Sequence, residues 1–177
     1  QMCIRDSQYC VDHELMRGVG NRKFAPKMVM TRAQMVQVLY NIAGEPAVTG
    51  ETPFTDLTAN WYQNAVLWAY QTGVTSGTSE TTFSPNDPVT REQVAVLLYK
   101  FADKVLEVGG AETPADLSRF PDGDQVSSWA REAMADAVAL GIINGTKVDD
   151  QVFLAPQGSA TRDQIATMFE GFCASLA

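Results

Sequence analysis

Positive charge is scarce in this sequence. The 177 residues include 13 Lys plus Arg against 21 Asp plus Glu and a single His, which gives a formal net charge of −8 and a pI near 4.5. Proteins that bind nucleic acid without sequence preference usually carry a basic face, so nucleic acid is not an expected partner. No apolar run approaches the roughly 20 residues that a membrane-spanning helix needs, and no membrane insertion is expected.

Cysteine is scarce as well. Cys3, Cys10 and Cys173 are too few and too scattered for a disulfide framework, and an odd count leaves at least one thiol unpaired. The first residues lack a basic segment followed by an apolar stretch, so no signal peptide is visible. Residues 2–7 resemble translated sequencing-adapter read-through, and we treat residues 1–8 as suspect.

The composition is that of a globular chain. Hydrophobic residues make up 45% and charged residues 19% of the sequence, which is enough apolar material to bury a core. At roughly 150 residues per domain, the length fits either one compact unit or several small repeated units.

Internal repetition is visible in three copies of one motif. In each copy a Phe-x-Pro or Leu-x-Pro segment is followed, five residues after the proline, by a Thr-Arg-x-Gln segment. The first segments lie at 24–26, 83–85 and 154–156, and the second lie at 31–34, 90–93 and 161–164. Three matches at one spacing indicate tandem repeats.

Each Thr-Arg-x-Gln segment is typical of a helix start. Thr-x-x-Gln is a capping box, in which the Thr hydroxyl and the Gln side chain each accept a backbone N–H of the other residue. Apolar residues then follow with the i, i+3, i+4, i+7 spacing of one helical face. They are Met35, Val38, Leu39 and Ile42; Val94, Leu97, Leu98 and Phe101; and Ile165, Met168, Phe169 and Phe172.

A second helix is expected in front of each motif. From Ala65 to Gly77 and from Ala133 to Gly145 the pattern is an amphipathic helix ended by glycine. Linkers rich in Gly, Pro, Thr and acidic residues divide the chain into the units 1–48, 49–112 and 113–177. The first unit lacks its front half. We therefore expect an all-α chain of three tandem helix-loop-helix repeats.

These spaced motifs resemble the S-layer homology (SLH) domain family. The resemblance covers nearly the whole chain from about residue 9 and implies a pseudo-threefold, three-pronged bundle. It also implies a non-catalytic module outside the cell, at the cell surface or in the cell wall. Such modules anchor exported proteins noncovalently to a secondary cell-wall polymer, commonly a pyruvylated, acidic polysaccharide, through grooves between repeats. Covalently linked cargo domains are then expected outside this chain.

The resemblance assigns ligand-binding roles position by position. The groove arginine of the family is matched by Arg32, Arg91 and Arg162, and its backbone-contact glycine by Gly18, Gly77 and Gly145. The groove tryptophan is matched by Trp61 and Trp129, and the aspartate near the start of the repeat by Asp56 and Asp122. This sequence departs from the commoner pattern in having Gln at the fourth motif position, a longer third loop and no front to its first copy.

The arginines support a binding role independently of the family. A cation is unfavourable at the first position of a helix, so its recurrence there favours function over a solvated surface residue. A guanidinium can hold a carboxylate through two parallel hydrogen bonds, and helix-end and turn amides add further donors. The two tryptophans could equally belong to the core, and the two aspartates are expected to bond to nearby amides.

Other functions have less support. The alternative reading is a degenerate SLH repeat that acts as a protein-interaction or structural module of the cell envelope. No catalytic residue, cofactor or metal site is expected. Cys10 and His13 lack a second ligand pair at zinc spacing, and Asp122-Gly123-Asp124 lacks the remaining ligands of a calcium loop. An envelope hydrolase would need its catalytic residues from another domain.

Overall fold

The computed structural model describes residues 25–176, so the predictions for Gly18, Cys10 and His13 lie outside the described residues. The helices of this part are α2 (Arg32–Ile42), α3 (Gln63–Gln71), α4 (Arg91–Phe101), α5 (Arg131–Ala139) and α6 (Arg162–Ser175). Shorter turns are η1 (Asn60–Tyr62), η2 (Ala102–Leu106), η3 (Leu117–Arg119), η4 (Gly123–Gln125) and η5 (Ser128–Ala130). Among these described helices, none combines the length and apolar character needed to cross a membrane.

The three Thr-Arg-x-Gln segments begin α2, α4 and α6, as predicted. At α2 the hydroxyl of Thr31 accepts from the Gln34 N–H at 3.2 Å, and the Gln34 side chain accepts from the Thr31 N–H at 3.0 Å. Thr90 and Gln93 repeat this arrangement at α4. The apolar face that follows each capping box is buried, which fixes one side of each helix in the core.

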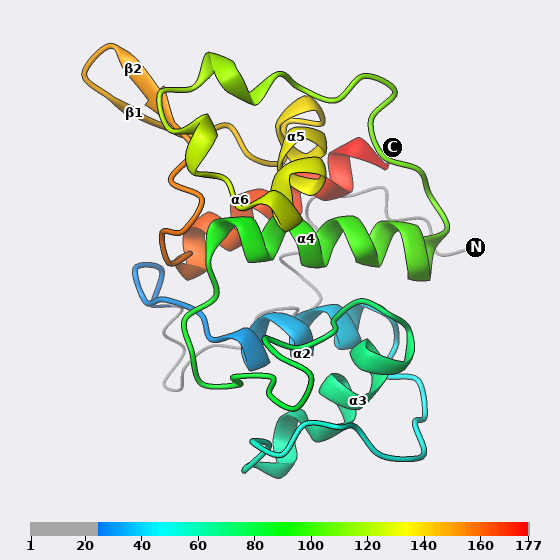
Figure 1. The fold of residues 1–177 in the computed structure, drawn as a ribbon. Coiled ribbons are helices and arrows are strands. Elements are labelled where there is room, and N and C mark those ends of the chain that lie inside the picture. The colour runs from blue at the N-terminus through cyan, green and yellow to red at the C-terminus, as the bar shows by residue number, and fades with distance from the viewer. Residues whose placement is uncertain (1–24, 177) are drawn as a thin grey trace.

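The first helix of a repeat packs against the second helix of the repeat before it. Figure 1 shows α3 beside α2 in the lower half of the molecule, and α5 above α4 in the upper half. The buried side chains of α3 and α5 include Ala65, Ala69 and Met134. Because small residues such as alanine permit close approach of two helices, the repeats interlock rather than stand as separate units.

The residues just before α2, α4 and α6 form a closed cycle of backbone hydrogen bonds. The N–H of Met30 donates to the carbonyl of Ala160 at 3.1 Å, and the N–H of Ala160 donates to Val89 at 2.9 Å. The N–H of Val89 donates to the carbonyl of Met30 at 2.9 Å, which closes the cycle. All three side chains are almost fully buried, so the starts of the three helices meet at one point in the core.

The third repeat departs from the predicted all-α fold. Its longer loop forms an antiparallel hairpin of β1 (Thr146–Val148) and β2 (Gln151–Phe153), in which Thr146 lies opposite Phe153. Asp149 adopts the left-handed conformation that a tight hairpin turn requires. The prediction recognised the extra length of this loop but not its strand pairing. The remaining described elements are helical, so the expected helical class is confirmed with this one correction.

Candidate functional site

The three motif arginines are buried where the repeats meet. Arg32, Arg91 and Arg162 expose 5%, 7% and 5% of their surface. Nε of Arg32 donates to the carbonyl of Phe83 at 2.8 Å, and Nε of Arg91 donates to the carbonyl of Leu154 at 2.8 Å. Each acceptor begins the Phe-x-Pro or Leu-x-Pro loop of the following repeat. Arg32 and Arg91 therefore have a structural role that the sequence analysis did not predict.

Besides making this structural bond, Arg32 lines a groove together with Gly77 and Trp129. Its guanidinium carbon lies 4.8 Å from the centre of the Phe83 ring, a cation–π distance. Burial lowers the pKa of the Arg32 side chain, and the carboxylates of Asp87 and Asp56 oppose that shift. Arginine stays charged in proteins, so the groove contains a fixed cation. Among the described residues, none accepts a hydrogen bond from its two Nη atoms.

The two predicted aspartates hold the loops that the arginines contact. The carboxylate of Asp56 accepts from the N–H groups of Phe83 at 2.9 Å and Ser84 at 2.7 Å. Ser84 adopts a positive φ of 57°, which is costly for a residue with a side chain. The two charge-assisted bonds offset that cost. Amide binding by the aspartates is confirmed, although these amides lie 27 and 28 residues away in sequence and are not local.

Asp122 plays the same part in the third repeat. Its carboxylate accepts from the N–H groups of Leu154 at 2.9 Å and Ala155 at 2.7 Å, and the residue exposes only 5% of its surface. Ala155 also has a positive φ, of 47°. Both carboxylates thus hold the backbone of the loop that follows in their own repeat.

The turn glycines occupy positions that other residues cannot take. Gly77 has φ +84°, and a Cβ added there would lie 2.5 Å from both the Phe54 ring and the Thr82 carbonyl oxygen. Gly145 has φ +76°, and its added Cβ would lie 2.5 Å from Val152. Glycine is therefore required at both turns, because any other residue would be strained and would collide with its neighbours.

The two predicted tryptophans are exposed, which removes the alternative that they belong to the core. Trp61 and Trp129 expose 55% and 58% of their surface, at the turns η1 and η5. The ring of Trp61 meets that of Tyr62 edge to face, with centroids 4.9 Å apart. The third tryptophan, Trp68, is buried against Tyr40 and Phe101.

One groove brings together three of the predicted residues. Its volume is about 480 Å³, and its walls include Arg32 of the first repeat, Gly77 of the second and Trp129 of the third. Two further polar side chains, Gln93 and Lys100, enter it from α4. The groove thus offers a second cation, Lys100, together with an exposed aromatic face.

Sequence reasoning missed Gln93 and Lys100. They line the groove together with Val96 and Leu97, and these four positions have the i, i+3, i+4, i+7 spacing of a second face of α4. That spacing could have identified a groove-lining face of α4, but the sequence analysis considered only the more apolar face of this helix. The groove does not include Arg91, Gly145, Arg162, Trp61, Asp56 or Asp122.

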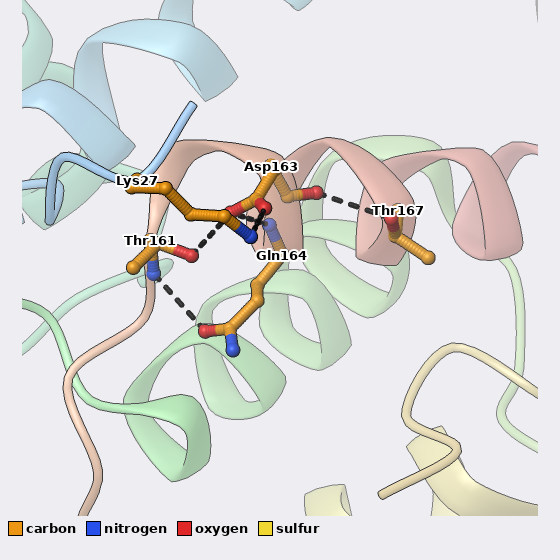
Figure 2. Close-up of polar contacts among 5 residues, drawn as sticks. All are labelled: Lys27, Thr161, Asp163, Gln164 and Thr167. Atoms are coloured by element: carbon orange, nitrogen blue, oxygen red, sulfur yellow. Dashed lines mark hydrogen bonds and ion pairs between the residues drawn. The ribbon is translucent and has the colours of Figure 1, made fainter. Parts of the chain in front are cut away.

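The junction between the third and first repeats carries an ion pair. Nζ of Lys27 lies 2.7 Å from a carboxylate oxygen of Asp163, as Figure 2 shows. Thr161 also donates to Asp163, and these two contacts lower the pKa of the Asp163 carboxyl to about 2. Backbone bonds from Arg162 to Met28 and from Asp163 to Pro26 complete the junction.

Metal binding has no candidate site in residues 25–176, where no three His, Cys, Asp or Glu side chains gather.

Comparison with known proteins identifies the family. The S-layer homology domain model matches residues 8–36, 53–95 and 119–166, and the chain belongs to this family. Each matched segment falls within one of the three divisions proposed from the sequence. Family membership agrees with the predicted location at the cell surface.

Curated relatives include surface proteins and a polysaccharide-degrading enzyme. The chain is 31% identical to the surface-layer 125 kDa protein of Lysinibacillus sphaericus over 92% of its length, which is 13% of that protein. It is 33% identical to exoglucanase XynX of Acetivibrio thermocellus, over 89% of this chain and 14% of the enzyme. It is 26% identical to a cellulosome-anchoring protein of the same species, over 83% and 32%. The chain thus spans only a small part of each of these relatives.

Proposed function

We propose that this chain is a non-catalytic anchor that binds an acidic cell-wall polysaccharide in the groove of Arg32, Gly77 and Trp129. The observation that carries the proposal is the meeting of these residues, one from each repeat, in one groove with Lys100. A carboxylate on the polymer would pair with the two cations. The exposed Trp129 ring would contact the apolar face of a sugar or a ketal methyl group.

The charge of the whole chain makes this recognition local. A net charge of −8 repels a polyanion at long range, but solvent ions screen that repulsion beyond about 10 Å. Inside the groove the polymer meets fixed positive charge instead. Binding should therefore depend on contacts at short range and receive little help from electrostatic steering.

The three divisions 1–48, 49–112 and 113–177 would act as the prongs of one pseudo-threefold assembly. The hydrogen-bond cycle of Met30, Val89 and Ala160 supports this arrangement, because each helix start is bonded to both of the others. In such an assembly the remaining assigned residues, Arg91 with Gly145 and Arg162 with Trp61, would belong to two further grooves.

The relatives suggest what the anchor carries. Their names describe surface-layer, cellulosome-anchoring and exoglucanase proteins, and the chain matches a small part of each. We infer that this chain holds a covalently linked cargo domain to the cell wall, and that any catalytic activity belongs to that cargo.

The test is a pull-down on purified cell-wall sacculi, before and after chemical removal of the secondary polymer. Trp129→Ala removes an exposed groove residue, and Trp61→Ala removes the similarly exposed tryptophan at the equivalent position of the second repeat, which lies outside this groove. We expect binding to be lost after removal of the polymer and weakened about tenfold or more by Trp129→Ala, with a smaller effect of Trp61→Ala.

A second variant separates charge from aromatic contact. Lys100→Gln removes one groove cation, and Lys104→Gln removes an exposed cation outside the groove that pairs with Asp103. Weaker binding only for Lys100→Gln supports an anionic ligand. Retention of full binding on stripped sacculi and in every variant would favour the alternative, a protein-interaction or structural module. The burial of the arginines at repeat junctions is the observation in favour of that alternative.

A further inference from the structure

A second cavity lies within the third repeat and shares no residue with the groove. Its volume is about 450 Å³, in the range of small-molecule sites. Phe120, Val138 and Val152 give it an apolar floor. Polar side chains from three segments surround that floor, and they are Arg119, Asn144, Asp150 and Gln151.

The cavity is explained by a difference between the second and third repeats. In the second repeat Tyr70 packs edge to face on Phe54, with ring centroids 5.4 Å apart. Phe120 is the counterpart of Phe54 in the repeat, and Val138 is the counterpart of Tyr70. Replacing the tyrosine ring with a valine leaves a space of ring size beside Phe120.

The hairpin that distinguishes the third repeat closes the other side of this space. Gln151 and Val152 belong to β2, and Asp150 precedes them in the turn. The second repeat has a shorter loop at this place and no strands. The cavity is therefore a feature of the third repeat, created jointly by a smaller side chain and an inserted hairpin.

The polar side chains at the rim can serve a ligand. Arg119 lies 4.9 Å from the centre of the Phe120 ring, and Asn144 donates to the Gly141 carbonyl, which leaves its amide oxygen as an acceptor. Within residues 25–176, the side chains of Arg119, Asp150 and Gln151 form no other hydrogen bond or ion pair. Together they provide both donors and acceptors, and the charges of Arg119 and Asp150 offset each other.

We propose that this cavity binds one pyranose ring of a neutral saccharide. The apolar floor of Phe120, Val138 and Val152 suits the C–H face of the ring, and the amide and charged groups suit its hydroxyls. An anionic sugar would gain no net charge attraction here. In this respect the cavity differs from the groove, which contains Arg32 and Lys100.

The experiment is a nuclear magnetic resonance titration of the isotopically labelled chain with the methyl glycosides of glucose, galactose, mannose and N-acetylglucosamine. The methyl signals of Val138 and Val152 report on the cavity, and the indole signal of Trp129 reports on the groove. We expect at least one neutral glycoside to shift the valine signals to saturation, and glucuronic acid to do so more weakly. Valine signals that move with none of the four, or move as much with glucuronic acid, would overturn the proposal.

The decisive variant restores the residue of the second repeat. Val138→Tyr should place a ring against Phe120, as Tyr70 lies against Phe54, and weaken glycoside binding about tenfold or more while the protein stays folded. Its melting curve checks the fold. Undiminished binding to Val138→Tyr would refute the site.

Gln151→Ala provides a test that does not disturb the core, since this side chain is exposed. Its matched control is Gln157→Ala, an exposed glutamine that bonds instead to the Gln125 carbonyl. Weaker glycoside binding only in Gln151→Ala is expected, and equal binding in both variants would count against the proposal. Because Trp129 is read separately, failure at this cavity leaves the anchoring groove untouched, and the reverse also holds.

Discussion

Arg91, the first residue of α4, donates from Nε to the carbonyl oxygen of Leu154, 63 residues further along the chain, at 2.8 Å. Arg32 makes the equivalent bond to Phe83 in the second repeat. The arginine of one repeat thus fixes the loop of the next. This bond explains why a cation occupies a helix start, where the helix dipole alone disfavours it.

The first prediction concerns this bond. Arg91→Ala should lower the free energy of unfolding by about 2 kcal/mol, because it removes a buried, charge-assisted hydrogen bond and leaves the Leu154 carbonyl without its donor. Urea unfolding followed by circular dichroism measures the change. Arg131→Ala is the matched control, since Arg131 also opens a helix but is exposed. Equal effects of the two substitutions would show that the Arg91 bond contributes nothing to stability.

Local features of the fold were predictable from the sequence, because they depend on residues three or four positions apart. The capping box of Thr31 and Gln34 and the buried face behind it are of this kind. The burial of Arg32 was not predictable, since its partner Phe83 comes from another repeat. The sequence showed an arginine at the first position of a helix, which is unusual, but only the packing of the repeats shows what that arginine contacts.

The candidate site divides in the same way. The repeat spacing identified Trp129 as a candidate binding residue. Its exposure depends on how the three repeats pack together, so the sequence did not decide between a core and a surface position. The cavity beside Phe120 required knowledge that Val138 and Val152 face the same space. The β1–β2 hairpin was missed because the added loop is short and its pairing is set by the register between Thr146 and Phe153.

A second prediction tests the support of the strained loop. Asp122→Asn should destabilise the chain by about 2 kcal/mol, because an amide offers one acceptor to the N–H groups of Leu154 and Ala155 where the carboxylate offers two. Differential scanning calorimetry measures the lowered melting temperature. Asp124→Asn, two residues away and exposed, should leave it nearly unchanged. If neither substitution changed the melting temperature, the Asp122 carboxylate would not stabilise this loop.

A third prediction concerns the turn beneath the groove. Gly77→Ala should cost at least about 2 kcal/mol, because the left-handed backbone is unfavourable for alanine and the new Cβ would collide with Phe54 and Thr82. Chemical unfolding gives the magnitude. Gly109→Ala is the control, because a Cβ at Gly109 meets nothing within 4 Å. Comparable stability of the two variants would mean that the turn relaxes without cost.

The last prediction is the pH dependence of the junction between the third and first repeats. Lys27 and Thr161 hold the pKa of Asp163 at about 2 in the folded chain, below its ordinary value of 3.8. A carboxyl whose pKa is lower when folded stabilises the fold above its unfolded pKa. That contribution is lost as the pH falls from about 4 to about 2. It should amount to no more than about 1 kcal/mol, since solvent screens an exposed pair.

Urea unfolding at about pH 6 and about pH 2.5 measures this contribution when the original chain is compared with Asp163→Asn. The difference in unfolding free energy should be present at the higher pH and shrink at the lower. Lys27→Met isolates the ion pair, because it leaves the contact between Thr161 and Asp163 in place. We expect a smaller loss from Lys27→Met than from Asp163→Asn, with the same dependence on pH. A difference that stays constant between the two pH values would show that the charge of Asp163 does not stabilise the junction.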